Sequence, residues 1–106
     1  LVPLDESRDV LDLAHAIGAS VVLVARDELG VLSHALTATL AVRARGLPLC
    51  ALVLVRPRDA DASTRTNASI LRARLECPVL EWPPCDDDDD RLADAAGPVL
   101  RALGLD

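Results

Sequence analysis

The stretch of this chain with the clearest potential for chemistry is a short charged loop that leads into a helix, residues 26–33. It follows an apolar run and contains a single glycine, Gly30, after which a helical pattern begins. Backbone N–H groups in the first turn of a helix have no partner within the helix, and with the helix dipole they attract anions. The pattern therefore predicts an anion site here, although a plain tight turn at Gly30 explains the same residues.

Other residue types that perform chemistry are sparse or poorly spaced. All eleven basic residues are arginine, and no glycine-rich phosphate loop is present, so the chain cannot supply the lysine of a P-loop enzyme. Five consecutive aspartates, Asp86 to Asp90, cannot converge on one cation, and we interpret them as negative charge before the last helix. Cys50, Cys77 and Cys85 lack metal-binding spacing and are interpreted as buried or incidental thiols. We predict no metal site, and we expect His34 to have a packing role.

Composition excludes several classes of partner. The 106 residues carry a net charge of −6 and only one aromatic side chain, which argues against binding to nucleic acid. No apolar run approaches the roughly 20 residues of a membrane span, and no signal peptide is visible. We therefore expect a cytoplasmic protein, with a core built from Leu, Val, Ile and Ala.

The elements that must position the loop alternate between apolar runs and helical patterns. The apolar runs are continuous, which favours strands covered on both faces, as in a parallel sheet flanked by helices. Strands that alternate with crossover helices predict an α/β fold with a three-layer parallel sheet, in a single domain over residues 1–106. Three strands make a narrow sheet, so we expect further strands from another segment or chain. The predicted strands are Ser20–Ala25, Leu49–Val55 and Pro78–Leu80.

Four helices are predicted around these strands. The first is capped by Asp5 or Ser7, and the second runs from Leu32 to Arg45, with Ser33 as a possible cap. The third begins at Ser63 or Thr64, and the fourth covers residues 91–103 with a break or restart at Pro98. The side chains predicted to face inward are Val10, Leu11, Leu13, Ala14 and Ile17 in the first helix, Leu32, Ala35, Leu36, Leu40 and Val42 in the second, and Ile70, Leu71 and Leu75 in the third.

Several motifs together resemble a known family. The residues Val21–Val24, Leu29–Gly30, His34–Ala35 and Thr37 resemble the C-terminal half of dethiobiotin synthetases, whose loop and helix start normally read LGxINH. Ser33 stands at the asparagine of that motif. The similarity extends through Arg45-Gly46-Leu47 and through residues 78–84, and residues 1–4 match the segment after the family's EGAGG motif. The resemblance implies the C-terminal half of a P-loop NTPase-like fold, without the P-loop.

That family uses ATP, Mg²⁺ and CO₂ to close a ureido ring on 7,8-diaminononanoate in biotin biosynthesis, and its members are homodimers. The resemblance implies that the helix start receives the substrate carboxylate across the dimer interface. It also implies that the end of the second strand and the proline loop surround the adenine, with Val55 in place of an adenine-reading asparagine. The implied substrate-binding residues are Gly30, Val31, Leu32 and Ser33, and the implied nucleotide-binding residues are Val55, Arg56, Pro83, Pro84 and Cys85.

The family's P-loop, switch aspartate and EGAGG glutamate would all precede Leu1. We therefore expect no catalytic residue in this chain and no activity from it alone, with ATP and Mg²⁺ bound by the complete protein. The expected partners are a second copy or the N-terminal half, and a small diamino carboxylate. Two alternatives remain open: a non-catalytic dimerisation or regulatory module, and an accessory domain of a related amide ligase or acyltransferase.

Overall fold

The computed structural model describes residues 2–57, 66–84 and 89–104 of the chain. Three parallel strands form one sheet in the order β1-β2-β3, and each pair of neighbouring strands is joined by a crossover that contains a helix. The predicted α/β fold with a parallel sheet and flanking helices is confirmed. In chain order the elements are α1 (Val10–Ala16), β1 (Val21–Arg26), α2 (Val31–Ala44), β2 (Leu49–Val55), α3 (Asn67–Arg74), β3 (Val79–Trp82) and α4 (Asp89–Ala102).

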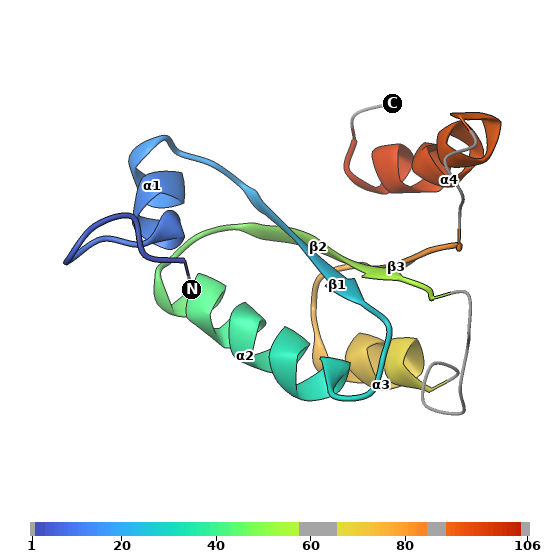
Figure 1. Cartoon of the computed structure of the whole chain (residues 1–106), viewed down its shortest axis with the longest axis horizontal. Coiled ribbons are helices and arrows are strands. Elements are labelled where there is room, and N and C mark those ends of the chain that lie inside the picture. The colour runs from blue at the N-terminus through green and yellow to red at the C-terminus, as the bar shows by residue number, and fades with distance from the viewer. Residues whose placement is uncertain (1, 58–65, 85–88, 105–106) are drawn as a thin grey trace.

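The helices occupy both sides of the sheet, as Figure 1 shows. Helices α2 and α3 lie side by side against one face, whereas α4 lies on the opposite side near β3, and α1 lies at the end where β1 begins. The main core is between the sheet and the pair α2 and α3. Its buried residues are Val31, Ala35, Leu52, Leu54, Ala68, Leu71 and Val79.

Only the central strand is covered on both faces. Residues 51–54 of β2 are all buried, but β1 alternates between half-buried and exposed side chains, and Val24 is 66% exposed. The prediction that β1 is covered on both faces is therefore wrong. One face of β1 stays exposed because β1 is an edge strand of the described sheet and α4 covers β3 rather than β1.

Helix α1 begins later than predicted. Its cap is Asp9, whose carboxylate accepts hydrogen bonds from the amides of Leu11 and Asp12, while the Asp12 carboxylate accepts from the Asp9 amide in return. Asp5 instead accepts from the amides of Ser7 and Arg8 in the preceding turn, so neither Asp5 nor Ser7 caps the helix. Of the predicted apolar stripe only Leu11 is buried, since α1 touches the fold at one end of the sheet.

The inward face of α2 also differs from the prediction. Gly30 is the cap, not Ser33, and the buried positions are Val31, Ala35, Thr39 and Val42. Leu40 is 69% exposed, so its predicted place in the core is wrong. Thr39 is tolerated in the core because its hydroxyl donates to the Ala35 carbonyl at 2.7 Å. The rotation of a helix about its axis depends on what it packs against, which local spacing does not reveal.

The last two helices bring smaller corrections. Helix α3 is described from Asn67 onward, so the predicted start at Ser63 or Thr64 lies outside the described residues. Leu71 is fully buried as predicted, whereas Ile70 is exposed, because it lies on the solvent side of the helix. Helix α4 runs from Asp89 to Ala102 through Pro98, so the predicted break is wrong. Pro98 lies at an exposed position, where water can replace the backbone hydrogen bond that proline cannot donate.

Candidate functional site

The start of α2 leaves three backbone donors open. Gly30 caps the helix in a left-handed conformation (φ 92°) and contributes no side chain. The Val31 amide donates to the Glu28 carbonyl at 3.1 Å, so it is already used in the turn. The amides of Gly30, Leu32 and Ser33 have no acceptor within the part of the chain that the structure describes. Of the four amides implied by the resemblance, these three are available to an anion.

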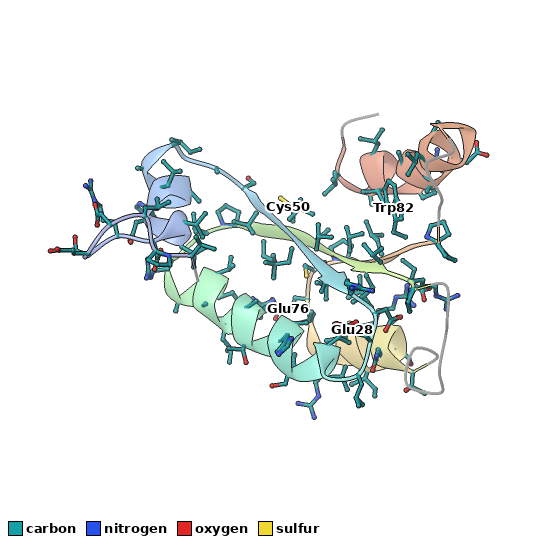
Figure 2. The ribbon with its side chains drawn as sticks, viewed as in Figure 1. Glu28, Cys50, Glu76 and Trp82 are labelled. Atoms are coloured by element: carbon teal, nitrogen blue, oxygen red, sulfur yellow. The ribbon has the colours of Figure 1, made fainter. Side chains whose placement is uncertain are left out.

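A cavity of 300 Å³ lies beside this helix start, between the edge of β1 and one face of α2. Its wall is mostly apolar, and its polar contributors are Arg26, Glu28 and His34. The Arg26 side chain is 75% exposed and lies 3.8 Å from the Glu28 carboxylate, a loose surface ion pair that leaves the guanidinium accessible. Figure 2 shows Glu28 near the first turn of α2. The cavity thus offers groups of both charges over an apolar surface.

Asp27 is a buried polar residue that the sequence reasoning missed. It is fully buried, and its Oδ1 atom accepts a hydrogen bond from the Asn67 side-chain amide at 2.8 Å. Its Oδ2 atom is also buried, and no described residue donates to it. The Asp27 amide donates to the Val55 carbonyl at 2.8 Å. Asp27 therefore ties the loop before α2 both to the end of β2 and to the start of α3.

The residue types around Asp27 do not mark it as buried. It lies in a charged loop, Arg26-Asp27-Glu28, where carboxylates are normally solvated, and its partner Asn67 is 40 residues away in the chain. The alternation of β1 does offer a clue, since Asp27 continues the face that carries Leu23 and Ala25 towards the core.

A second cavity, of 270 Å³, lies at the carboxyl ends of the strands and reaches α4. Four of the five positions implied for nucleotide binding line it, and the fifth, Cys85, lies outside the described residues. The complete set of lining residues is Arg26, Val55, Arg56, Pro57, Trp82, Pro83, Pro84 and Leu92.

Backbone hydrogen bonds fix the floor of this second cavity. The Arg56 amide donates to the Trp82 carbonyl at 2.9 Å, next to the bond between Asp27 and Val55, so the strand ends stay aligned beyond the sheet. The Arg56 guanidinium is paired with Glu81 at 3.0 Å, and Arg72 of α3 lies 3.6 Å from the same carboxylate. Glu81 is therefore shared by two guanidinium groups, and the three side chains together keep a net positive charge.

Other candidate sites find no support in the described residues. Among them, no group of three or more His, Cys, Asp or Glu side chains is arranged to hold a metal ion, and Cys50 and Cys77 are free thiols. Aspartates 86–88 lie outside these residues. In the described part of the chain, no helix is long and apolar enough to cross a membrane.

Comparison with known proteins identifies the family. A family model described as an AAA domain matches residues 1–84, which is most of the chain. The ATP-dependent dethiobiotin synthetase BioD of Nitrosospira multiformis is 39% identical over 90 residues, which are 85% of this chain and 40% of that protein. The proteins of the same name from Anaeromyxobacter dehalogenans and Acidiphilium cryptum are 38% and 42% identical, over 96% and 84% of this chain and 46% and 39% of their own lengths.

The chain thus spans less than half the length of these curated relatives. No solved structure gives a significant match. The resemblance to dethiobiotin synthetases is confirmed by these relatives, and the chain belongs to the AAA domain family that the matching model describes.

Proposed function

We propose that this chain is part of an ATP-dependent dethiobiotin synthetase-like ligase and supplies its substrate-carboxylate site. The observation that carries the proposal is the start of α2, where the amides of Gly30, Leu32 and Ser33 are open. These three residues do not line the neighbouring cavity themselves; of the four implied positions only Val31 does. Open first-turn amides and the positive end of a 14-residue helix favour a carboxylate. Because the relatives are named dethiobiotin synthetases, the carboxylate is that of 7,8-diaminononanoate.

The same cavity suits the rest of such a substrate. A diamino carboxylate combines an aliphatic chain with cationic amines, and the wall formed by β1 and α2 is apolar with Glu28 at its rim. In this arrangement the chain orients the substrate by its carboxylate end and excludes water from its aliphatic part. Ring closure uses ATP and CO₂, and the residues of this chain hold the substrate for that step.

ATP and Mg²⁺ place different demands on this chain. The 270 Å³ cavity at the strand ends fits the base of a nucleotide, and we assign Val55, Arg56, Pro83 and Pro84 to it. The described residues do not fit a Mg²⁺ site, since no carboxylate cluster is present among them. We therefore assign no residue of this chain to the metal and no catalytic residue to the ring closure.

We also propose that the chain associates with a second copy or with the remainder of the enzyme through the edge of β1. The outer face of this strand exposes Val24, and no strand pairs with its free edge in the described structure. Light scattering at high concentration tests this directly. We expect association in the parent and less of it in Val24→Arg, and a strictly monomeric parent would contradict association with a second copy.

The carboxylate site is tested by a matched pair of substitutions at one exposed position. Ser33→Pro removes one open amide in the first turn, where proline is best tolerated, whereas Ser33→Ala keeps that amide. One hydrogen bond to a charged group contributes about 1.5–3 kcal/mol, so we expect Ser33→Pro to weaken diaminononanoate binding at least about tenfold. Calorimetry with diaminononanoate, and with dicarboxylates and amino acids as competing ligands, measures the affinity and its selectivity. Equal binding by both variants and the parent would place the site elsewhere.

A second candidate function has its own support. Val55 cannot make the paired hydrogen bonds of the asparagine that the family carries there, and Ser33 replaces another family asparagine. Both departures favour a non-catalytic dimerisation or regulatory module. Assay of the complete gene product with ATP, CO₂ and diaminononanoate separates the two: dethiobiotin formation supports the ligase, and its absence together with no ATP hydrolysis supports the module.

A further inference from the structure

The only aromatic side chain of the molecule lines the cavity at the strand ends. Trp82 is the last residue of β3, and Figure 2 shows it between the sheet and α4. Pro83 and Pro84 follow it along the cavity wall, and Leu92 contributes from α4. Indole and proline rings present flat apolar surfaces, which accept a planar ring by stacking.

Two backbone carbonyls and one guanidinium on the wall of this cavity already have a partner. The Val55 carbonyl accepts from the Asp27 amide, and the Trp82 carbonyl accepts from the Arg56 amide. The Arg56 guanidinium is paired with Glu81 at 3.0 Å. The Val55 side chain offers no hydrogen bond at all. Among the described lining residues, only Arg26 presents a side-chain charge without a close partner, since its nearest carboxylate is 3.8 Å away.

We propose that the nucleotide base is held here by stacking on Trp82 and that the cavity therefore discriminates weakly between adenine and guanine. This inference rests on the proposed function, and it makes Trp82 the residue that holds the base and Val55 the position that leaves base selectivity weak. Ligand pockets typically measure roughly 300–1,000 Å³, so a cavity of 270 Å³ holds one ring system and leaves the phosphates outside. Arg26 lies at the rim, where a guanidinium can contact a phosphate.

The reason for weak selectivity is physical. Every base has a π-face, so stacking on an aromatic side chain tolerates a change of base. A site that pairs with the base edge behaves differently, because a wrong base leaves its buried polar groups without partners. Because Val55 has no polar side-chain atom, adenine gains no hydrogen bond from it, and guanine leaves no buried polar group of this side chain without a partner.

Trp82 fluorescence provides the first test, because this chain has no other aromatic residue. We titrate the chain with ADP, GDP and ribose 5-phosphate and follow the emission of Trp82. The proposal predicts saturable quenching by both nucleotides with dissociation constants within about fivefold, and none by ribose 5-phosphate. Absence of quenching by either nucleotide, or a preference for ADP above about fiftyfold, would overturn it.

Substitutions at Trp82 separate stacking from a structural role. Trp82→Phe keeps an aromatic face, whereas Trp82→Leu keeps only apolar bulk. By calorimetry, Trp82→Leu is expected to weaken both ADP and GDP about tenfold, and Trp82→Phe to retain most of the affinity. Equal affinities in both variants and the parent would overturn the proposal.

A gain-of-selectivity variant keeps the proposal testable if Trp82→Leu fails to fold. Val55→Asn restores a side chain that can pair with the adenine edge, and Val55→Thr serves as a control of similar shape. We expect Val55→Asn to raise the preference for ADP over GDP at least about tenfold. An unchanged ratio would show that the base does not lie against this position and would overturn the proposal.

The two proposals fail in different ways. Dethiobiotin formation by the complete gene product with ATP, and far less with GTP, would overturn weak base selectivity and leave the ligase in place. Quenching of Trp82 by both nucleotides without any ring closure would support the stacking site and overturn the ligase.

Discussion

The two ends of helix α2 are built in opposite ways. At its C-terminal end, the Arg45 guanidinium donates to Asp9 Oδ2 and to Asp12 Oδ1, each at 2.7 Å, and so joins α2 to the cap of α1. At its N-terminal end, Gly30 provides no capping side chain, and nearby Asp27 has a buried oxygen without a described donor. Hydrogen-bonding groups are paired at the C-terminal end of α2, which we call the closed end, and several lack a described partner at the N-terminal end, which we call the open end.

The comparison shows that the hydrogen-bonding groups at one end of α2 stabilise the fold, whereas the first-turn amides at the other end are accessible to a ligand. The closed end lies beside α1, away from the two cavities described above, although a third hollow of 260 Å³ is lined there by Asp12 and by other residues in and before α1. The open end lies at the carboxyl edge of the sheet, where parallel α/β folds bind ligands, and both cavities begin there. The first-turn amides can bind water, whereas the Asp27 Oδ2 atom is buried without a described donor, so this edge holds polar groups that a ligand could satisfy.

The largest expected effect concerns the buried pair at the open end. Asn67→Ala removes the only described donor to the Asp27 carboxylate and should destabilise the fold by about 1–3 kcal/mol. Denaturant unfolding followed by Trp82 emission measures this.

Ser69→Ala, at an exposed position of the same helix, is the control and should be nearly neutral. The double variant Asp27→Ala/Asn67→Ala should cost less than the sum of the single changes, because the two residues are in contact. A loss in Asn67→Ala no larger than that in Ser69→Ala would show that the buried pair contributes nothing.

The next effect is the backbone strain at the start of α2. An added Cβ at Gly30 would meet nothing within 4 Å, so Gly30→Ala should cost only the left-handed conformation, about 1–2 kcal/mol. Thermal unfolding of Gly30→Ala against the parent measures this cost, and an unchanged melting temperature would contradict it.

A smaller effect appears at acid pH and concerns the closed end. The Arg45 hydrogen bond is the main cause that holds the pKa of Asp9 below its ordinary value of 3.8. A lowered carboxyl pKa adds stability that is present above the unfolded-state value and lost as the pH falls through the folded-state value. Arg45→Gln should therefore raise the pKa of Asp9 towards 3.8 and start acid unfolding at a higher pH.

NMR titration of Asp9 and unfolding curves between neutral and acid pH give the two measurements. Arg43→Gln, in the last turn of the same helix, is the control for a simple change of net charge. If Arg43→Gln moves the acid transition as far as Arg45→Gln does, the specific contact is not responsible.

The smallest effect is expected at Ser33. This residue is exposed and makes no capping hydrogen bond, so Ser33→Ala should change stability by less than about 0.5 kcal/mol. Asp9→Ala removes two accepted amide hydrogen bonds at the α1 cap and should cost more. Comparison of the two variants by denaturant unfolding shows whether capping is confined to the closed end.

Much of the fold follows from local patterns. The continuous apolar runs at residues 21–25 and 49–55 identify strands, and Gly30 identifies the start of α2, because strand burial and helix capping depend on nearby residues. The positions implied for the nucleotide also meet around one cavity, since parallel strands end at the same edge. Side-chain burial was predicted less well, as Leu40 and Ile70 show, because it depends on which face of each helix the sheet covers.

By itself, the sequence determined the order of strands and helices, the parallel arrangement of the sheet and the family resemblance, all of which depend on composition, periodicity and motifs along the chain. Only the tertiary structure decided that Asp27 is buried against Asn67, that Val24 stays exposed, and that Trp82 lines a cavity closed by α4. The physical reason is distance along the chain. Asp27 and Asn67 are separated by α2 and β2, and the cavity that Trp82 lines takes residues from the ends of all three strands and from α4, so no local pattern specifies that they meet.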